Sequence, residues 1–392
     1  MPWESTTVTE ERLRFVLAYQ KKVLTGKVSM SALCAEFSIA RKTGYKFLAR
    51  QESEGWAGLA DRSRAPLSGC HWIEPQVREA ILQVKRELSD FGAKKIVAHL
   101  HRVDPDRAWP SVSAVHQTLK RAGLVERKAS RRCSAHPGAP PPFTAKAPNE
   151  EWSADFKGQF RTRDRRYCYP LTIADTFSRC LLSCVSLLQP SFEQSWRVFD
   201  QAFREYGVPE SIRSDNGPPF ASTALRRLSQ LSVRWIRLGI RPVLIEPGHP
   251  QQNARHERMH RTLKEGVCSS PAANWREQQK DFDHFRKRFN EVRPHESLGQ
   301  IPPAEIYSSS PRPYPAQLPP IEYPSSVEVR RVNHNGVIKW QGRAIFLTEV
   351  LAGEHVAVRA VDDGVWLALF GPVLLGYYSQ RDQKFYPDKE PA

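Results

Sequence analysis

The chain has 392 residues, and its 58 lysines and arginines against 42 aspartates and glutamates give a formal net charge of +16. This length predicts several domains, and the charge favours a polyanionic partner such as nucleic acid. There is no uncharged apolar run of about 18 residues and no signal-peptide pattern, so we expect no membrane partner and a location inside the cell. The seven cysteines are scattered without a C-x-x-C pair, which indicates neither a disulfide framework nor a zinc site.

Residues 1–60 carry three predicted helices, of which the third has the character of a recognition helix. Apolar residues recur at helical spacing over residues 10–24, a second helix follows from about Ser29, and the third spans residues 40–55. The first turns of a recognition helix present side chains to the major groove, so this pattern predicts a helix-turn-helix DNA-binding domain. The predicted contacts are Arg41, Lys42, Thr43, Tyr45 and Lys46. A plain three-helix bundle with solvated charges is the alternative.

Residues 61–74 are rich in glycine, proline and serine, and we interpret them as a basic linker. Its Arg62 and Arg64 could follow a DNA backbone or groove, and a solvated tether is an equally good interpretation. Three more amphipathic segments fill residues 75–126, which predicts a second helical DNA-binding domain. Its expected DNA contacts are Lys120 and Arg121.

Two proline-rich segments divide the rest of the chain. Residues 127–149 and residues 311–324 show neither helical nor strand periodicity, so we interpret both as linkers, the first of them basic. Short runs of valine, isoleucine and aromatic residues with turn residues between them fill residues 325–392. This pattern predicts a small antiparallel β-barrel.

The segment between the linkers, residues 150–310, alternates strand and helix patterns. Three strand-like runs precede a helix and a short strand, and a further helix at residues 222–232, a strand at residues 233–238 and a long helix from about Gln251 follow. This order predicts an α/β domain with a mixed five-stranded sheet flanked by helices.

Three carboxylates in this segment suggest a metal site. Asp155 lies inside an apolar strand-like run, between Ala154 and Phe156, where a charged side chain without a cation is disfavoured. Asp215 ends a short strand just before an Asn-Gly turn, and Glu257 lies in a polar helix. Carboxylates with no neighbouring cysteine or histidine pair favour Mg²⁺ or Mn²⁺ over zinc.

Four motifs, WSADFKG, SDNGPPF, PGHPQQNARHERMHRTLKE and FNEVRPHESLGQIPP, closely resemble the integrase-core transposases of bacterial insertion sequences, which are relatives of retroviral integrases. The resemblance covers roughly residues 150–310 and the helix-turn-helix region. It implies a ribonuclease H-like core in which Asp155, Asp215 and Glu257 form the DDE triad and bind two metal ions. Asp215 and Glu257 are 42 positions apart (257 minus 215), farther than is typical of retroviral integrases.

Other acids could take these places. Asp164, Asp175 and Asp200 are alternatives to Asp155, and Glu265 is an alternative to Glu257. Asp175 is the most serious of them because it also follows an apolar run, but only Asp155 precedes a Lys-Gly turn as the family's first acid does. We therefore interpret Asp175 as a structural acid.

The residues around Glu257 suggest contacts with DNA. Positions three, four and seven residues after it share its helical face, and these are His260, Arg261 and Lys264. The basic side chains could hold phosphates, and a solvated basic face is the alternative. Residues 249–253 form a polar loop that either reaches the substrate or caps the helix. Residues 293–296 are expected to brace the fold.

Together the motifs predict a DNA transposase that cleaves DNA and transfers strands. Its expected partners are double-stranded DNA, both the terminal inverted repeats and the target, and further copies of the chain assembled on that DNA. The resemblance places such a protein in the bacterial cytoplasm at the nucleoid. A hydrolysis-only nuclease of ribonuclease H type and a non-enzymatic DNA-binding repressor are the alternatives.

Overall fold

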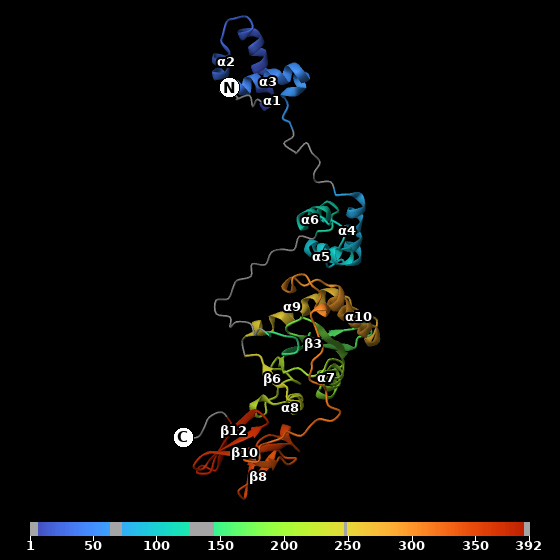
Figure 1. Cartoon of the computed structure of the whole chain (residues 1–392), viewed down its shortest axis with the longest axis vertical. Coiled ribbons are helices and arrows are strands. Elements are labelled where there is room, and N and C mark those ends of the chain that lie inside the picture. The colour runs from blue at the N-terminus through green and yellow to red at the C-terminus, as the bar shows by residue number, and fades with distance from the viewer. Residues whose placement is uncertain (1–6, 63–72, 126–144, 247–248, 388–392) are drawn as a thin grey trace. The chain divides into compact units, whose positions relative to one another are not determined.

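The computed structural model describes residues 7–62, 73–125, 145–246 and 249–387, and the chain divides into two compact units, Met1–Trp72 and Ile73–Ala392 (Figure 1). The first unit is helical. The second contains three helices, a central sheet with helices on both faces, and C-terminal strands. Among the described residues, no helix combines the length and the apolar character needed to cross a membrane.

The first unit consists of the three predicted helices, α1 (Val8–Ala18), α2 (Met30–Glu36) and α3 (Arg41–Glu54), with a π turn at Tyr19–Val23 and a 3-10 turn at Gly55–Leu59. Two side-chain caps define where α1 and α2 begin. The Thr7 hydroxyl accepts from the Glu10 N–H, and the Ser29 hydroxyl accepts from the Ala32 N–H. The small core comprises Phe15, Val16, Leu33, Cys34 and Leu59.

Gly44 is the point of closest packing between α3 and the other two helices. A Cβ at this position would lie 2.8 Å from Phe15 Cζ, 2.8 Å from Met30 Cε and 2.9 Å from Cys34 Sγ. We therefore expect Gly44→Ala to destabilise the first unit by about 1 to 3 kcal/mol, because overpacking forces the surrounding side chains to shift. Chemical denaturation monitored by circular dichroism would measure this, with Gly92→Ala, where φ is -86° and a Cβ would meet nothing within 4 Å, as the uncrowded control; an unchanged midpoint for Gly44→Ala would contradict the packing.

The second unit begins with three amphipathic helices that pack around a core of their own. The α4 helix starts with Pro75 at its first position, which suits a residue without an N–H, and the Ser111 hydroxyl caps α6. The helices are α4 (Pro75–Glu87), α5 (Ala93–Val103) and α6 (Val112–Arg121). All three occupy the residues expected from the sequence.

Ion pairs join these helices to a later part of the same unit. The Asp90 carboxylate pairs with Arg288 at 3.0 Å and also with Arg293. Lys94 pairs with Glu296 at 2.7 Å. Arg293 and Glu296 thus brace the helices against the core, as the sequence suggested.

Six strands form the central sheet: β1 (Glu151–Phe156), β2 (Phe160–Arg161), β3 (Tyr167–Asp175), β4 (Leu181–Leu187), β5 (Ser211–Ser214) and β6 (Arg241–Leu244). The β3 strand pairs antiparallel with β1, β2 and β4, whereas β1, β5 and β6 run parallel. The sheet is mixed, as predicted. It has one strand more than the expected five because the chain turns at Gly158 and adds the two-residue β2.

Helices cover both faces of this sheet (Figure 1). On one face α7 and α8 pack against Trp152, Ala154 and other apolar strand residues, and on the other face α9 and α10 pack against Cys168, Ala174 and Cys184. The four helices are α7 (Phe192–Tyr206), α8 (Gln230–Arg237), α9 (Ala254–Leu263) and α10 (Trp275–Lys287). Short 3-10 or π turns lie at Leu225–Arg227, Pro250–Asn253, Lys264–Cys268, Arg288–Val292, Glu296–Leu298, Pro303–Glu305 and Glu349–Leu351.

The sequence interpretation was wrong at α8. Residues 233–238 were expected to form a strand, but they belong mostly to this helix, and the strand is β6. The helix begins at Gln230, later than the expected residue 222, because Ser229 and Ser232 form a reciprocal capping box there. Val233, Trp235 and Ile236 are all buried. Residues 233–238, whose apolar and basic side chains partly alternate as in a strand, therefore supply the apolar side of a short helix.

A single buried asparagine ties the beginning of the core to its end. The Asn149 Nδ2 donates to the Ser308 carbonyl at 2.8 Å, and its Oδ1 accepts from Trp152 Nε1 at 2.9 Å and from the Tyr307 hydroxyl at 2.8 Å. The two ends of the core, near residues 149 and 308, therefore meet at one point.

The C-terminal residues form an antiparallel sheet and a separate hairpin. The sheet order is β13-β12-β11-β10-β7, and β8 pairs only with β9. The predicted barrel is therefore not closed in the described residues, because β13 and β7 remain at opposite edges of the sheet. The strands are β7 (Glu328–Arg331), β8 (Val337–Trp340), β9 (Arg343–Phe346), β10 (His355–Asp362), β11 (Val365–Phe370), β12 (Val373–Ser379) and β13 (Lys384–Tyr386).

This C-terminal part shares a hydrophobic core with α8 and with Leu228, two positions before that helix begins. Leu228, Val233 and Ile236 are buried in one cluster with C-terminal side chains such as Trp340 and Phe370. Around the cluster, Arg237 pairs with Glu354, and its guanidinium also donates to the carbonyl oxygens of residues 318 and 319. The C-terminal strands are thus packed against the central domain.

Candidate active site

The alternation of side chains along β1 directs Asp155 toward α9. Trp152 and Ala154 face the core beneath α7 and α8, so Glu151, Ser153 and Asp155 face the opposite side of the sheet. The side chain of Asp155 is 17% exposed.

The structure brings the three predicted carboxylates into one neighbourhood. Asp215 directly follows β5, the parallel neighbour of β1, so it lies at the same edge of the sheet as Asp155. Glu257 lies in the first turn of α9. Burial, followed by the negative charges of Asp215 and Glu257, raises the pKa of Asp155 to about 7. Burial also raises the pKa of Asp215, against the hydrogen bond that its carboxylate accepts from the Gly217 N–H.

The Thr172 hydroxyl, together with His256 and His260, forms a hydrogen-bonded group next to Asp155. Thr172 is the cross-strand partner of Asp155, and its hydroxyl donates to the Asp155 carbonyl oxygen at 2.9 Å. The Nε2 atoms of His256 and His260 each lie 2.7 Å from the same hydroxyl oxygen. Since a hydroxyl has one proton to donate, both histidines must donate Nε2–H to Thr172. Burial lowers the pKa of His256 to about 3 and that of His260 to about 2, so both rings are neutral.

This network changes the interpretation of two residues. His260 was expected to contact DNA, but its ring is buried against Thr172, with Nδ1 3.8 Å from the Asp155 carboxylate. It shares the helical face of Glu257 yet points into the sheet. The Asn253 side chain makes no capping hydrogen bond and instead donates to Asp155 Oδ2 at 3.0 Å. The supporting roles of Thr172, Ser153 and His256 were missed because only the strand register brings them together.

Possible metal-binding atoms gather around Asp155. Among the described residues, donor atoms of Asp155, His256 and His260 lie within 4.8 Å of one another, and this close group includes neither Asp215 nor Glu257. The imidazole Nε2 atoms donate to Thr172, and His256 Nδ1 lies 2.8 Å from the Ser153 hydroxyl. We therefore interpret the two histidines as supports for Asp155.

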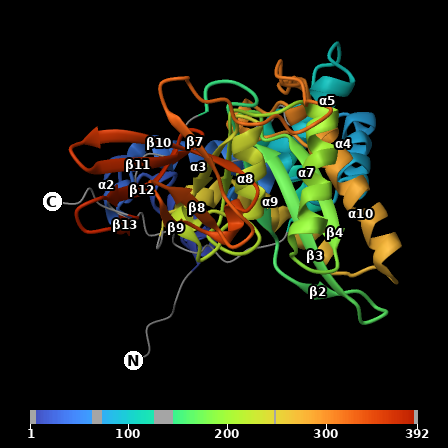
Figure 2. The same ribbon diagram turned by 90° about the horizontal axis from the view of Figure 1, so that it is seen from below.

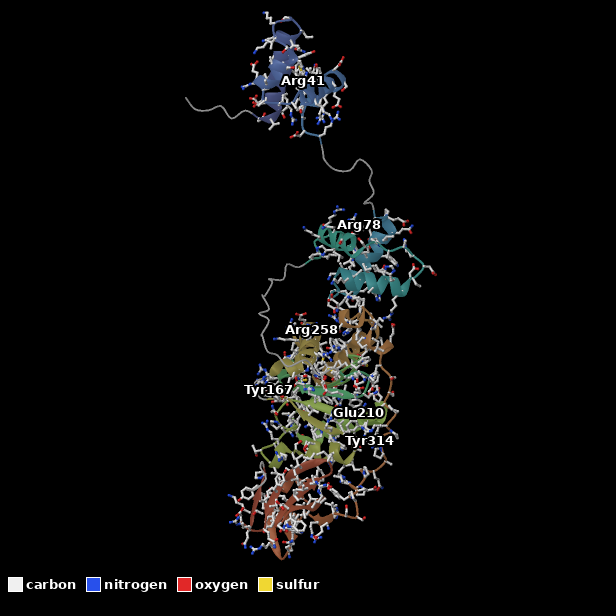
Figure 3. All side chains as sticks on the ribbon, turned by 60° about the vertical axis from the view of Figure 1, so that its left-hand side comes forward. Arg41, Arg78, Tyr167, Glu210, Arg258 and Tyr314 are labelled. Carbon is white, nitrogen blue, oxygen red and sulfur yellow. The ribbon has the colours of Figure 1, made fainter. Side chains whose placement is uncertain are left out.

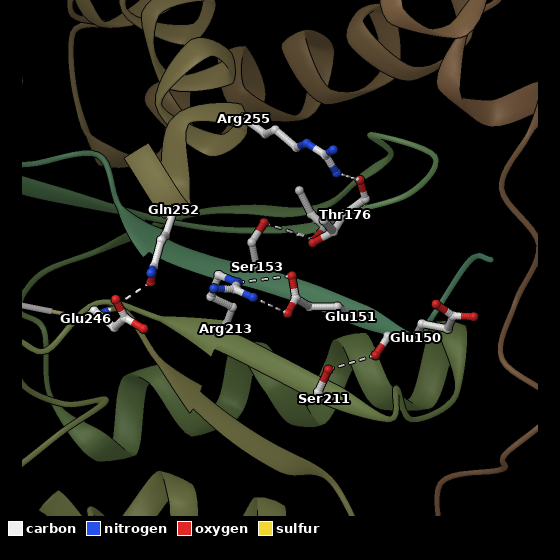
Figure 4. Close-up of polar contacts among 10 residues, drawn as sticks. Glu150, Glu151, Ser153, Thr176, Ser211, Arg213, Glu246, Gln252 and Arg255 are labelled. Carbon is white, nitrogen blue, oxygen red and sulfur yellow. Dashed lines mark hydrogen bonds and ion pairs between the residues drawn. The ribbon is translucent and has the colours of Figure 1, made fainter. Parts of the chain in front are cut away.

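A buried ion pair fixes the strands that carry the two aspartates. Arg213 on β5 donates from Nε and Nη2 to the two carboxylate oxygens of Glu151 on β1, at 3.1 and 2.9 Å (Figure 4). The Ser211 hydroxyl adds a bond to the Glu150 carbonyl at 2.8 Å. A bidentate, buried pair of this kind has a defined geometry, so it holds β1 and β5 in register next to the site.

The competing acids have other partners or lie elsewhere. The Asp175 carboxylate accepts from the N–H groups of Asn149 and Ser178, and it lies across from Trp152, at the other end of β1 from Asp155. Asp200 pairs with Arg204 on α7. Asp164 lies in the turn between β2 and β3, and Glu265 lies in the π turn after α9.

The remaining predicted DNA contacts are distributed over both units. In the second unit Arg261 and Lys264 are exposed on the α9 helical segment, and Lys120 and Arg121 are exposed at the end of α6, where cations also stabilise a helix C-terminus. In the first unit Arg62 pairs with Glu54. Arg64 lies outside the described residues. On α3, Arg41 is exposed (Figure 3). Lys42, Tyr45 and Lys46 are exposed as well, and Thr43 is partly buried.

The exposed side of α3 provides a test of sequence recognition. We expect Arg41→Ala combined with Lys42→Ala to weaken binding of the full chain to specific DNA by about 1 to 3 kcal/mol per lost base contact. Competition gel shifts with specific and random duplexes would measure the effect, and Lys27→Ala, an exposed cation outside α3, is the control. An equal loss on both duplexes would show that these residues contact phosphates alone.

Comparisons with known proteins agree with this geometry. Residues 145–250 and residues 238–303 each match the integrase core domain family, and residues 11–66 match a helix-turn-helix domain. The insertion element IS476 uncharacterized 39.2 kDa protein of Xanthomonas euvesicatoria is 33% identical over 205 residues, covering 50% of this chain and 56% of that protein. The insertion element IS407 uncharacterized 31.7 kDa protein of Burkholderia multivorans is 26% identical, covering 58% of this chain and 78% of that protein.

Among solved structures, the HTLV-2 integrase catalytic core domain in complex with magnesium is 17% identical, with a TM-score of 0.33 and coverage of 42% of this chain and 99% of that one. The matched segment spans little more than half of the IS476 protein. The similarity to integrase cores is therefore based on the domain matches, and the observed helices and mixed sheet agree with it. Residues 145–303 of this chain are thus similar to integrase core domains, and residues 11–66 are similar to helix-turn-helix domains.

Proposed function

We propose that this chain is the transposase of a bacterial insertion element, a polynucleotidyl transferase that cuts DNA at the ends of the element and joins those ends to a target. The observation that carries the proposal is the placement of Asp155 and Asp215 at the same end of two parallel strands, with Glu257 in the first turn of α9. The charges of Asp215 and Glu257 raise the pKa of Asp155. The insertion-element relatives supply the biological context.

The chemistry of these side chains fits divalent cations. A partly buried carboxylate next to two others is costly to ionise, and a cation bound among them removes that cost. Oxygen ligands of this type suit Mg²⁺ or Mn²⁺, and we propose two ions held by Asp155, Asp215 and Glu257. Bound cations would activate the attacking oxygen and stabilise the leaving oxygen in an in-line displacement at phosphorus.

The chain's own residues position this chemistry. Asn253 donates to one carboxylate oxygen of Asp155 while Thr172 donates to its backbone carbonyl, so the side chain and the backbone of Asp155 are each held by a hydrogen bond. Arg261 and Lys264, exposed one and two helical turns after Glu257, are suited to hold phosphates of the bound strand. The same arrangement serves water as the first nucleophile and the released 3′ hydroxyl as the second.

We further propose a division of labour along the chain. Residues 1–60 and 75–126 would bind the terminal repeats, with residues 61–74, 127–149 and 311–324 as linkers around a core at residues 150–310 and a C-terminal domain at residues 325–392. Joining two ends to one target needs two active sites, so we infer that copies of the chain assemble on DNA at the bacterial nucleoid.

A strand-transfer assay tests the proposal. The full chain would be incubated with Mg²⁺, labelled duplexes that end in the element's terminal repeats, and a supercoiled plasmid as target. The expected products are nicked ends and labelled ends joined to the plasmid, both abolished by EDTA. Cleavage without joining would instead favour the hydrolytic nuclease, and specific binding with neither reaction would favour the repressor.

A further inference from the structure

The β2–β3 hairpin carries a concentration of arginines that the proposed active site does not use. The hairpin follows β1 in the chain, with Phe160 only five positions after Asp155, and it projects from one end of the central sheet (Figure 2). Its four arginines and one acid, Asp164, leave three net positive charges within residues 160–167. The arginines are Arg161, Arg163, Arg165 and Arg166, all exposed.

The one acid is turned into the hairpin itself. The Asp164 carboxylate accepts hydrogen bonds from the Thr162 hydroxyl and from the Arg166 N–H, so it organises the turn. Its ion pair with Arg166 is long, at 3.8 Å. Among the described residues, the exposed guanidinium groups of Arg163 and Arg165 make no hydrogen bond or ion pair, which leaves both available to an anion.

The rest of the molecule holds the hairpin in place. The Arg163 and Asp164 N–H groups donate to the carbonyl oxygens of Ala272 and Ala273, at 3.0 and 3.1 Å. Arg161 lies over the Tyr167 ring, 4.4 Å from its centre, and donates to the Tyr167 hydroxyl at 2.7 Å. The arginines are therefore presented on a rigid support, which reduces the entropy lost when they bind a ligand.

The backbone at the tip of the hairpin gives a second indication. Arg165 has φ of 67°, a left-handed conformation that glycine adopts without strain and arginine does not. Strain of this kind concentrates where a side chain has a function other than stability. Arg165→Gly should therefore relieve strain and remove a cation in one step.

We infer that the β2–β3 hairpin binds the phosphate backbone of target DNA. Guanidinium groups bind phosphates with good geometry, and phosphate contacts carry no sequence information. The polar side chains of Thr162 and Asp164 in the same turn are bonded to each other. A target has no fixed sequence, whereas terminal repeats have one and would be read by α3. The identification of the bound DNA as target DNA rests on the proposed function. The DNA contact itself rests on the charge and rigidity of the hairpin.

The test uses the full chain with Arg163→Ala and Arg165→Gly combined. We expect affinity for random duplex DNA to fall about tenfold, and the slope of log affinity against log salt to decrease by about two, one for each lost phosphate contact. Specific end binding and end nicking should persist while joining to plasmid falls. The melting temperature should be unchanged or higher because strain is relieved, a result that a structural role would not give.

Two matched variants complete the experiment. Arg163→Lys with Arg165→Lys keeps both charges and should restore most of the random-duplex affinity. Gln341→Gly relieves a positive φ of 45° at a turn of the C-terminal hairpin without removing a charge, and should leave DNA affinity, salt slope, nicking and joining unchanged. Wild-type affinity and salt slope in the Ala/Gly variant would overturn the inference, whether or not the chain joins DNA. Absence of nicking and joining by the wild type would instead count against the proposed function alone.

Discussion

Asp155→Asn, Asp215→Asn and Glu257→Gln should each reduce metal-dependent nicking and joining by more than about a hundredfold. Loss of a residue that only hydrogen-bonds a metal ligand reduces activity up to about a hundredfold, and loss of the ligand itself should reduce it further. Each substitution removes a negative charge that a cation needs and leaves every DNA-binding side chain in place. Binding to end DNA in the absence of metal should therefore change little. The assay is quantitative strand transfer over a range of Mg²⁺ and Mn²⁺ concentrations.

Asp200→Asn is the matched control, because it removes a carboxylate of the same core that pairs with Arg204 away from the site. It should keep activity near the wild-type level. Asp155→Asn should not lower the melting temperature in EDTA at pH 8: a carboxyl whose pKa is raised to about 7 by folding costs stability once it ionises. Any of the three variants that still joins DNA efficiently would lose its place among the metal-binding residues.

Removal of residues 325–392 should destabilise the central domain itself. The deletion would expose Leu228, Val233 and Ile236, and burying each such side chain contributes about 1.5 to 3 kcal/mol. Their combined loss is comparable to the whole stability of a typical domain, about 5 to 15 kcal/mol. We expect the truncated chain to melt at a much lower temperature or to aggregate, as followed by differential scanning fluorimetry and size-exclusion chromatography.

A truncation after Tyr386 keeps every strand of the C-terminal sheet and should behave as the full chain does. An unchanged melting temperature for the longer deletion would mean that the C-terminal strands do not stabilise α8. Because the deletion is expected to unfold part of the core, it cannot by itself separate a role in assembly from a role in folding. Substitutions on the exposed side of the C-terminal sheet are better suited to that question.

The elements with strong periodic patterns were predictable from the sequence. The α4 helix, with Val77, Ile81 and Val84 buried on one side, and the β1 strand, with its alternating faces, have patterns that only one secondary structure satisfies. The three carboxylates were named through motifs. Their meeting at one edge follows from the parallel pairing of β1 with β5, which no local pattern encodes.

The incorrect predictions share a physical cause. Each concerned a segment whose sequence allows more than one local structure or orientation, and tertiary contacts selected one of them. The α8 residues could alternate as a strand, and the Ser229 cap together with burial on two sides made them a helix. The position of His260 on the face of Glu257 suggested exposure, but Thr172 on a neighbouring strand buries its ring. The predicted barrel is not closed in the described residues, because closure requires β7 to pair with β13, and composition does not specify that pairing.

The asparagine that joins the two ends of the core has a consequence for protein engineering. Because Asn149 bonds to Ser308, the core begins and ends at the same place, a geometry that tolerates circular permutation and insertion into other chains. Recombination between genes could exchange the segment between these residues as a cassette, provided that the ion pairs of the preceding helices with Arg288 and Glu296 are kept. On its C-terminal side the cassette would have to keep the strands that cover α8, so the exchangeable module is the core together with its C-terminal sheet.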